Sequence, residues 1–222
     1  MKLPSLRNAV HDALQTLSRF PLVLVSAATA TVAGIILMDL EGPPQPTILW
    51  SFLYGGILGI PLLIALRLTG EKRRWRPILS WGIQCAGVVI LVIYAATVPR
   101  NVPEAPASAV VRLLLFALAA HMLVAVAPWT GKGEINGFWQ YNKNLFLRIL
   151  VALLFAQVLF GGLAFALAAL DNLFGMQIAG KRYEELWVLM SVLFTTWFFL
   201  AGIPRNLDEL EAAREYPKGL VG

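Results

Sequence analysis

Six long apolar runs, separated by short polar stretches, dominate the hydrophobic pattern of the chain. A run of about twenty residues forms an α-helix roughly 30 Å long, which matches the hydrocarbon core of a bilayer. The runs predict transmembrane helices over residues 20–38, 47–68, 77–98, 109–127, 149–170 and 185–203. We therefore expect an all-α fold, a polytopic bundle of six transmembrane helices.

The first 19 residues follow a different pattern, in which apolar side chains recur every three or four positions. Leu6, Val10 and Leu14 share one predicted helix face, whereas Arg7 and Asp12 lie on the opposite face. This periodicity is typical of an amphipathic helix that lies on a membrane surface. We divide the chain into this surface helix (1–19), a transmembrane domain (20–203) and a short charged tail (204–222).

The composition supports a membrane protein. Apolar residues make up 58% of the chain and charged residues only 14%, whereas soluble proteins carry about 25% charged residues. The net charge of +5 does not indicate nucleic-acid binding, because the basic residues lie in short segments between apolar runs. The single cysteine, Cys85, allows neither an intrachain disulfide nor a cysteine-based metal cluster.

Lysine and arginine are distributed unevenly among the polar segments. If the N-terminus is cytoplasmic, only four of the 18 basic residues fall on the outer side: Arg100, Arg112, Lys181 and Arg182. Cytoplasmic segments of membrane proteins carry an excess of basic residues, so both termini are predicted to be cytoplasmic. The densest basic stretch, Lys72–Arg76, is interpreted as a topology signal. A binding patch for anionic lipid headgroups is the alternative.

Small residues at four-residue spacing indicate close packing between the first two predicted spans. Ala30 and Gly34 form such a pair in the first span, and Gly55 and Gly59 form one in the second. Pairs of this kind let two helix backbones approach closely.

An aromatic and amide block precedes the fifth span. Trp139, Gln140, Tyr141 and Asn142 lie close to Lys143, and aromatic residues beside basic ones are typical of a membrane interface. We expect the block to form an interfacial elbow. The alternative is that its amides bind a partner or a lipid headgroup.

Several motifs together resemble the bacterial membrane-protein family catalogued as domain of unknown function 4153. They are Arg19-Phe20-Pro21-Leu22, Phe138-Trp139-Gln140-Tyr141-Asn142-Lys143, Leu145-Phe146-Leu147-Arg148, Gly162-Leu163-Ala164, Leu173-Phe174-Gly175 and Trp197-Phe198-Phe199-Leu200-Ala201-Gly202-Ile203-Pro204. The resemblance implies a multi-pass protein of the bacterial inner (cytoplasmic) membrane with no assigned activity. Family members look longer, so this chain is expected to be either a short member or a fragment.

Groups that could do chemistry are few, and we expect no enzyme, no cofactor and no metal site. His121 is the only ionisable side chain well inside a predicted span, which makes it a candidate functional residue. Polar residues at a similar depth complete a candidate layer: Ser26, Gln84, Gln157 and Thr195. The layer is either a site for a proton or a small polar solute or a set of interhelical hydrogen bonds.

Arg112 lies about one turn inside the fourth predicted span. A carboxylate partner would lower the cost of a guanidinium at that depth. Asp171 is the predicted partner and Glu184 a second choice, and extension of the arginine to the membrane surface is the alternative.

The function expected from these observations is that of a non-catalytic membrane component. It would act through contacts with membrane lipids, with another membrane protein or with a second copy of the chain. The alternative is a transporter or channel subunit for a proton or small polar solute that uses the layer around His121.

Overall fold

The computed structural model describes residues 6–40, 47–97, 107–131 and 133–212, and all regular secondary structure in these ranges is helical. Within these ranges six helical segments are long and apolar enough to cross a membrane, which confirms the predicted number of spans. Five of them are α2 (Pro21–Asp39), α3 (Thr47–Lys72), α4 (Pro77–Ala95), α5 (Ala107–Val126) and α6 (Ile135–Phe174). The chain is therefore a multi-pass membrane protein.

The sixth span is built from three helical pieces that follow one another without a break. They are α7 (Lys181–Val188), the π-helix η3 (Leu189–Phe194) and α8 (Thr195–Ala201). The hydroxyl of Thr195 donates to the carbonyl of Met190, five residues earlier, at 2.9 Å. Three shorter elements complete the described part of the fold: α1 (Leu6–Arg19), the 3₁₀-helix η2 (Ala127–Trp129) and α9 (Glu209–Ala212).

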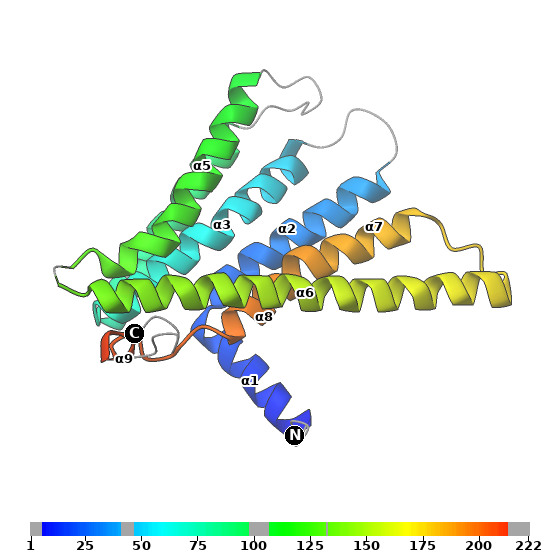
Figure 1. The fold of residues 1–222 in the computed structure, drawn as a ribbon. Coiled ribbons are helices and arrows are strands. Elements are labelled where there is room, and N and C mark those ends of the chain that lie inside the picture. Colours follow the sequence, from blue (N-terminus) through cyan, green and yellow to red (C-terminus); the bar gives the residue numbers. More distant parts are fainter. Residues whose placement is uncertain (1–5, 41–46, 98–106, 132, 213–222) are drawn as a thin grey trace.

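The helices spread like a fan from one end of the molecule (Figure 1). At this basal end α1 meets α2, α3 turns into α4, η2 precedes α6, and α8 leads to α9. We call the opposite end, where the helices diverge, the distal end. Helix α3 is central because it contacts α2, α4 and α5.

The largest cluster of buried apolar side chains lies at the basal end. Phe20, between α1 and α2, is almost fully buried there, as are Leu68 of α3, Tyr141 of α6 and Leu200 of α8. Trp129 and Ile203 join the same cluster. The main core thus forms where the helices converge, and it joins the first, second, fourth, fifth and sixth spans.

Close contact between α2 and α3 depends on glycine. A Cβ atom on Gly56 would lie 2.8 Å from the Cβ of Ala30, and one on Gly59 would overlap the hydroxyl of Ser26. The predicted seam is therefore confirmed for Ala30 and Gly59. Gly55 instead faces Ala95 of α4, because α3 packs against two helices on neighbouring faces.

The predicted elbow before the fifth span is wrong. Trp139, Gln140, Tyr141 and Asn142 belong to one continuous helix of 40 residues, α6. At 1.5 Å per residue this helix is roughly 60 Å long, about twice the thickness of a hydrocarbon core. It ends at Gly175, whose left-handed backbone (φ +62°) lets its N–H donate to the Asp171 carbonyl at 2.8 Å.

Helix α1 extends away from the bundle (Figure 1). The apolar side chains of Leu14 and Leu17 on this helix are exposed. Residues 1–5 and 213–222 lie outside the described residues, so the ends of the predicted surface helix and of the charged tail stay predictions.

Candidate functional site at the basal end

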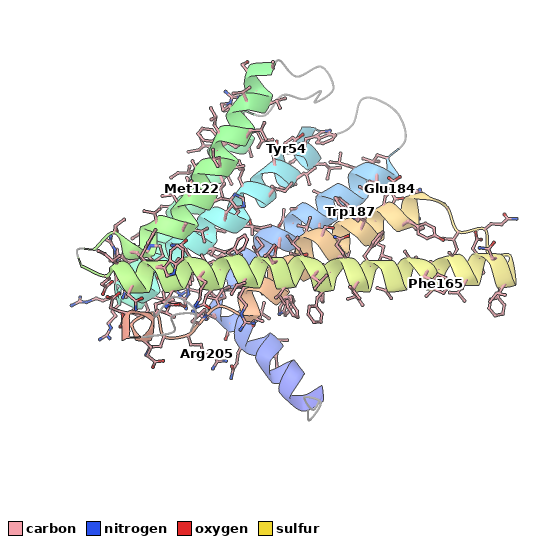
Figure 2. All side chains as sticks on the ribbon, viewed as in Figure 1. Tyr54, Met122, Phe165, Glu184, Trp187 and Arg205 are labelled. Carbon is pink, nitrogen blue, oxygen red and sulfur yellow. The ribbon has the colours of Figure 1, made fainter. Side chains whose placement is uncertain are left out.

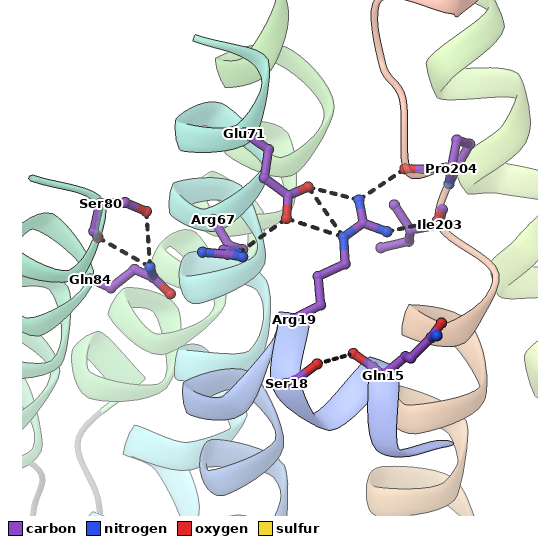
Figure 3. Close-up of polar contacts among 9 residues, drawn as sticks. All are labelled: Gln15, Ser18, Arg19, Arg67, Glu71, Ser80, Gln84, Ile203 and Pro204. Atoms are coloured by element: carbon purple, nitrogen blue, oxygen red, sulfur yellow. Dashed lines mark hydrogen bonds and ion pairs between the residues drawn. The ribbon is translucent and has the colours of Figure 1, made fainter. Parts of the chain in front are cut away.

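A guanidinium at the end of α1 joins three parts of the chain (Figure 3). The Nη2 and Nε atoms of Arg19 donate to the carboxylate of Glu71, on α3, at 2.7 and 3.1 Å. Its Nη1 and Nη2 atoms also donate to the carbonyls of Ile203 and Pro204, each at 2.9 Å. Two-pronged binding of a carboxylate by arginine is strong and directional. One side chain therefore connects the start of the first span to the ends of the second and sixth.

The same carboxylate serves a second arginine. Arg67 lies one helical turn before Glu71, and its Nε atom is 3.1 Å from a Glu71 oxygen. The Nε–H of Arg67 has no hydrogen-bond acceptor among the described residues, so the contact is an ion pair with poor hydrogen-bond geometry. Glu71 thus balances two guanidinium groups and leaves a net positive charge.

Lys72 forms the second centre of the network. Its ammonium lies 2.9 Å from Asp208 and 3.1 Å from Glu134, and 4.2 Å from the centre of the Trp129 ring. The Lys72 side chain is only 7% exposed. A buried cation needs such partners to offset its loss of hydration, and the indole face adds a cation–π contact.

Asp208 links Lys72 to the turn between α3 and α4. Its second oxygen accepts a hydrogen bond from Arg74 at 2.8 Å. Hydrogen bonds from Lys72 and Arg74 hold the pKa of the Asp208 carboxyl below its ordinary value. The aspartate is therefore charged at neutral pH and holds the segment before α9 against α3.

Glu211 of α9 caps the start of α6. Its carboxylate accepts the backbone N–H of Gly137, and its carbonyl accepts a hydrogen bond from Asn136 at 2.9 Å. A carboxylate is favourable at a helix N-terminus, where backbone N–H groups are unpaired and the helix dipole is positive. Position 137 must be glycine because a Cβ atom there would overlap the ring of Trp129.

Two residues of the aromatic and amide block cap the end of α5. The hydroxyl of Tyr141 donates to the Val124 carbonyl at 2.8 Å, and the amide of Asn142 donates to the Ala125 carbonyl at 3.3 Å. These carbonyls belong to the last turn of α5, where no intrahelical donor is available. Trp139 of the same block is exposed. The block therefore fastens α6 to α5 while α6 stays straight.

The candidate polar layer is dispersed over the molecule. His121 is exposed on α5, and its Nδ1 atom lies 2.7 Å from the carbonyl of Ala117 in the same helix. Gln84 is buried, and its amide donates to the Ser80 carbonyl of its own helix at 3.1 Å. Gln157 is exposed on α6.

The other two residues of the candidate polar layer, Ser26 and Thr195, contact different parts of the chain. Ser26 packs against Gly59 of α3, and Thr195 bonds within its own span. Among the described residues no hydrogen bond joins any two of the five members. The interhelical hydrogen bonds expected from the sequence are absent there; Gln84, His121 and Thr195 each contact a carbonyl of their own span instead.

The predicted ion pair between Arg112 and Asp171 is absent from the described part of the chain. The guanidinium of Arg112 lies instead 6.0 Å from the ring centre of Tyr94. A carboxylate oxygen of Asp171 accepts the backbone N–H of Ile178 at 3.0 Å, just after α6. The pair fails because α5 and α6 diverge toward the distal end (Figure 1).

The basal network was not predicted from the sequence. A signal exists for two of its members, because Glu71 and Glu134 are acidic residues in otherwise basic segments, whereas Asp208 lies in a segment rich in acidic residues. Comparisons with protein-family models, with curated proteins and with solved structures find no match for this chain. The resemblance to the family of unknown function stays a prediction.

Proposed function

We propose that the protein is a non-catalytic component of the bacterial inner membrane that binds another transmembrane helix. The contact surface is the distal half of α6, residues 157–174. The partner is a second copy of the chain or another membrane protein. With the basal end on the cytoplasmic side, this surface lies within the bilayer and toward its outer face.

The exposed side chains of this half-helix support the proposal. Val158, Phe165 and Leu173 are 67%, 77% and 78% exposed. Figure 2 shows Phe165 where α6 runs beyond the other helices. Lipid tails can cover such a surface, so exposure alone does not select a protein partner.

Gln157 is the observation that carries the proposal. Its side chain is exposed inside the apolar part of α6 and forms no hydrogen bond to another described residue. An amide without partners in hydrocarbon costs several kcal/mol. Glutamine side chains commonly form hydrogen bonds between transmembrane helices. A neighbouring helix would satisfy the amide, and lipid tails would not.

The arrangement supports transport less well. A conducting path needs polar groups that face one another across the bilayer, but His121 and Gln157 are exposed on helices that diverge. The cavity between α2, α3 and α4 has almost entirely apolar walls. No observation on the described residues therefore favours a solute path over a binding surface.

Site-specific photo-crosslinking in native membranes tests the proposal. A photoreactive amino acid at position 165 should give a protein adduct, and Gln157→Leu should lower its yield about threefold or more, as expected for loss of one interhelical hydrogen bond. The matched control is position 122 on α5, because Met122 is also an exposed apolar residue (Figure 2).

The mass of the adduct identifies the partner. A product of twice the chain mass indicates a second copy, and a product larger by another protein's mass indicates a different membrane protein. Adducts that add only the mass of a lipid would overturn the proposal. Equal yields at positions 165 and 122, or a yield that Gln157→Leu does not change, would overturn the proposal.

A further inference from the structure

A cavity of about 450 Å³ lies between α3, α4 and α5, away from the contact surface on α6. Its walls are apolar and include Leu58, Leu62, Leu91 and Leu123. This volume is within the range of small-molecule sites. Ile90 and Phe116, which also line the cavity, are exposed, so the cavity opens sideways toward the lipid.

One cation lies at the rim of this cavity. Arg112 is the sixth residue of α5, about 7.5 Å along the helix from its distal start. Its guanidinium faces the ring of Tyr94, and that ring is held by an edge-to-face contact with Phe116 at 5.0 Å. The side chain thus has a defined place beside the apolar walls.

Arg112 has no anionic partner among the described residues, and this distinguishes it from the other described cations at the distal end. Lys181 lies 2.8 Å from Asp39, and Arg182 lies 2.7 Å from Glu185. A guanidinium carries five N–H donors. A charged side chain inside a span without a carboxylate is a mark of a ligand or substrate site.

We propose that the cavity binds an anionic phospholipid of the leaflet on the distal side. The phosphate pairs with the guanidinium of Arg112, and one acyl chain occupies the apolar cavity between α3, α4 and α5. Arginine suits this role because its planar N–H groups bind phosphate through two oxygens at once. The single arginine matches the anionic headgroup of this lipid, and the apolar walls match its acyl chain. The site is independent of the helix contact proposed for α6.

Native mass spectrometry of the full chain, released from detergent after incubation with long-chain phosphatidylglycerol, tests the site. Wild type should retain one lipid molecule. Arg112→Gln should weaken retention about tenfold, and Arg112→Lys should have an intermediate effect, because lysine binds phosphate as a point charge. Arg182→Gln is the matched control and should retain lipid like wild type, because Arg182 is paired with Glu185.

A second variant separates a chain-binding cavity from simple attraction of headgroups. Ala119 lines the cavity and is exposed, so Ala119→Phe should fill it, remain folded and lose the lipid while Arg112 is present. If Ala119→Phe does not fold, short-chain phosphatidylglycerol replaces it and should bind more weakly than the long-chain lipid.

Inorganic phosphate in excess should not displace the lipid, because it lacks the chain. Retention that is equal in Arg112→Gln and Arg182→Gln overturns the proposal. The proposal is also overturned if lipid retention is the same in Ala119→Phe as in wild type and the same for short-chain and long-chain phosphatidylglycerol. Displacement by inorganic phosphate would also overturn it, in favour of a plain phosphate site. None of these outcomes changes the crosslinking test of α6.

Discussion

The two ends of the bundle both contain lysine–aspartate ion pairs, but the lysines differ in how far they are buried. At the basal end the Lys72 side chain is only 7% exposed, although its partners Glu134 and Asp208 are 40% and 43% exposed. At the distal end the pair of Lys181 and Asp39 has a similar distance of 2.8 Å, but both side chains are more than a third exposed. Exposed pairs contribute about 0–1 kcal/mol, whereas removing one partner of a buried pair costs about 3–5 kcal/mol.

This difference indicates which end of the bundle fixes the positions of the helices. The basal end combines ion pairs, helix caps and the main core, so it fixes the helices relative to one another. The distal end has mostly apolar contacts and few polar links among the described residues. Firm attachment at one end leaves the distal half of α6 exposed.

Glu71→Gln is expected to lower the unfolding free energy more than any other variant considered below. The substitution removes the charge that balances Arg19 and Arg67. Because these side chains are about one fifth exposed, the expected loss is about 2–3 kcal/mol, below the range for fully buried pairs. Unfolding by denaturant in detergent micelles measures it.

Lys181→Gln is the matched control at the distal end. It removes one charge from an exposed pair of similar distance and should cost less than about 1 kcal/mol. Equal losses for Glu71→Gln and Lys181→Gln would remove the distinction between the two ends.

A smaller effect is expected from Tyr141→Phe. The hydroxyl is buried, and its loss leaves the Val124 carbonyl without a donor at the end of α5. The expected cost is about 1–2 kcal/mol in unfolding free energy. Tyr183→Phe at the distal end is the control, because its hydroxyl donates to no other described residue. If Tyr141→Phe and Tyr183→Phe lower the unfolding free energy equally, the hydrogen bond from the Tyr141 hydroxyl does not hold α6 to α5.

The smallest expected effect is a change in how the unfolding free energy depends on pH in the acid range. The pKa of Asp208 is lower in the folded protein than its ordinary value of 3.8. Its contribution to stability is therefore complete above pH 3.8 and is lost as the pH falls through the lower, folded pKa. Unfolding free energy measured against pH should decline less steeply in Asp208→Asn than in wild type. Identical acid profiles would show that this carboxylate does not stabilise the basal end.

Particular residues show how far the candidate sites could be predicted. Contacts between residues close in sequence are the easiest to predict: Asn206 donates to Glu209, three residues later, at 2.7 Å at the start of α9. The role of Tyr141 could not be predicted, because its acceptor lies 17 residues away on another helix. The pairing of Arg112 with Asp171 was wrong because similar depth in a bilayer says nothing about distance within its plane.

The amino-acid sequence by itself determined six spans and the lengths of most of them, because hydropathy and helix rise are local properties. Only the tertiary structure decided which face of each span is buried. In a membrane both protein-facing and lipid-facing surfaces are apolar, so the apolar pattern does not mark the interior. Arg19 and Glu71, 52 residues apart, therefore look like separate boundary residues until the folded chain brings them together.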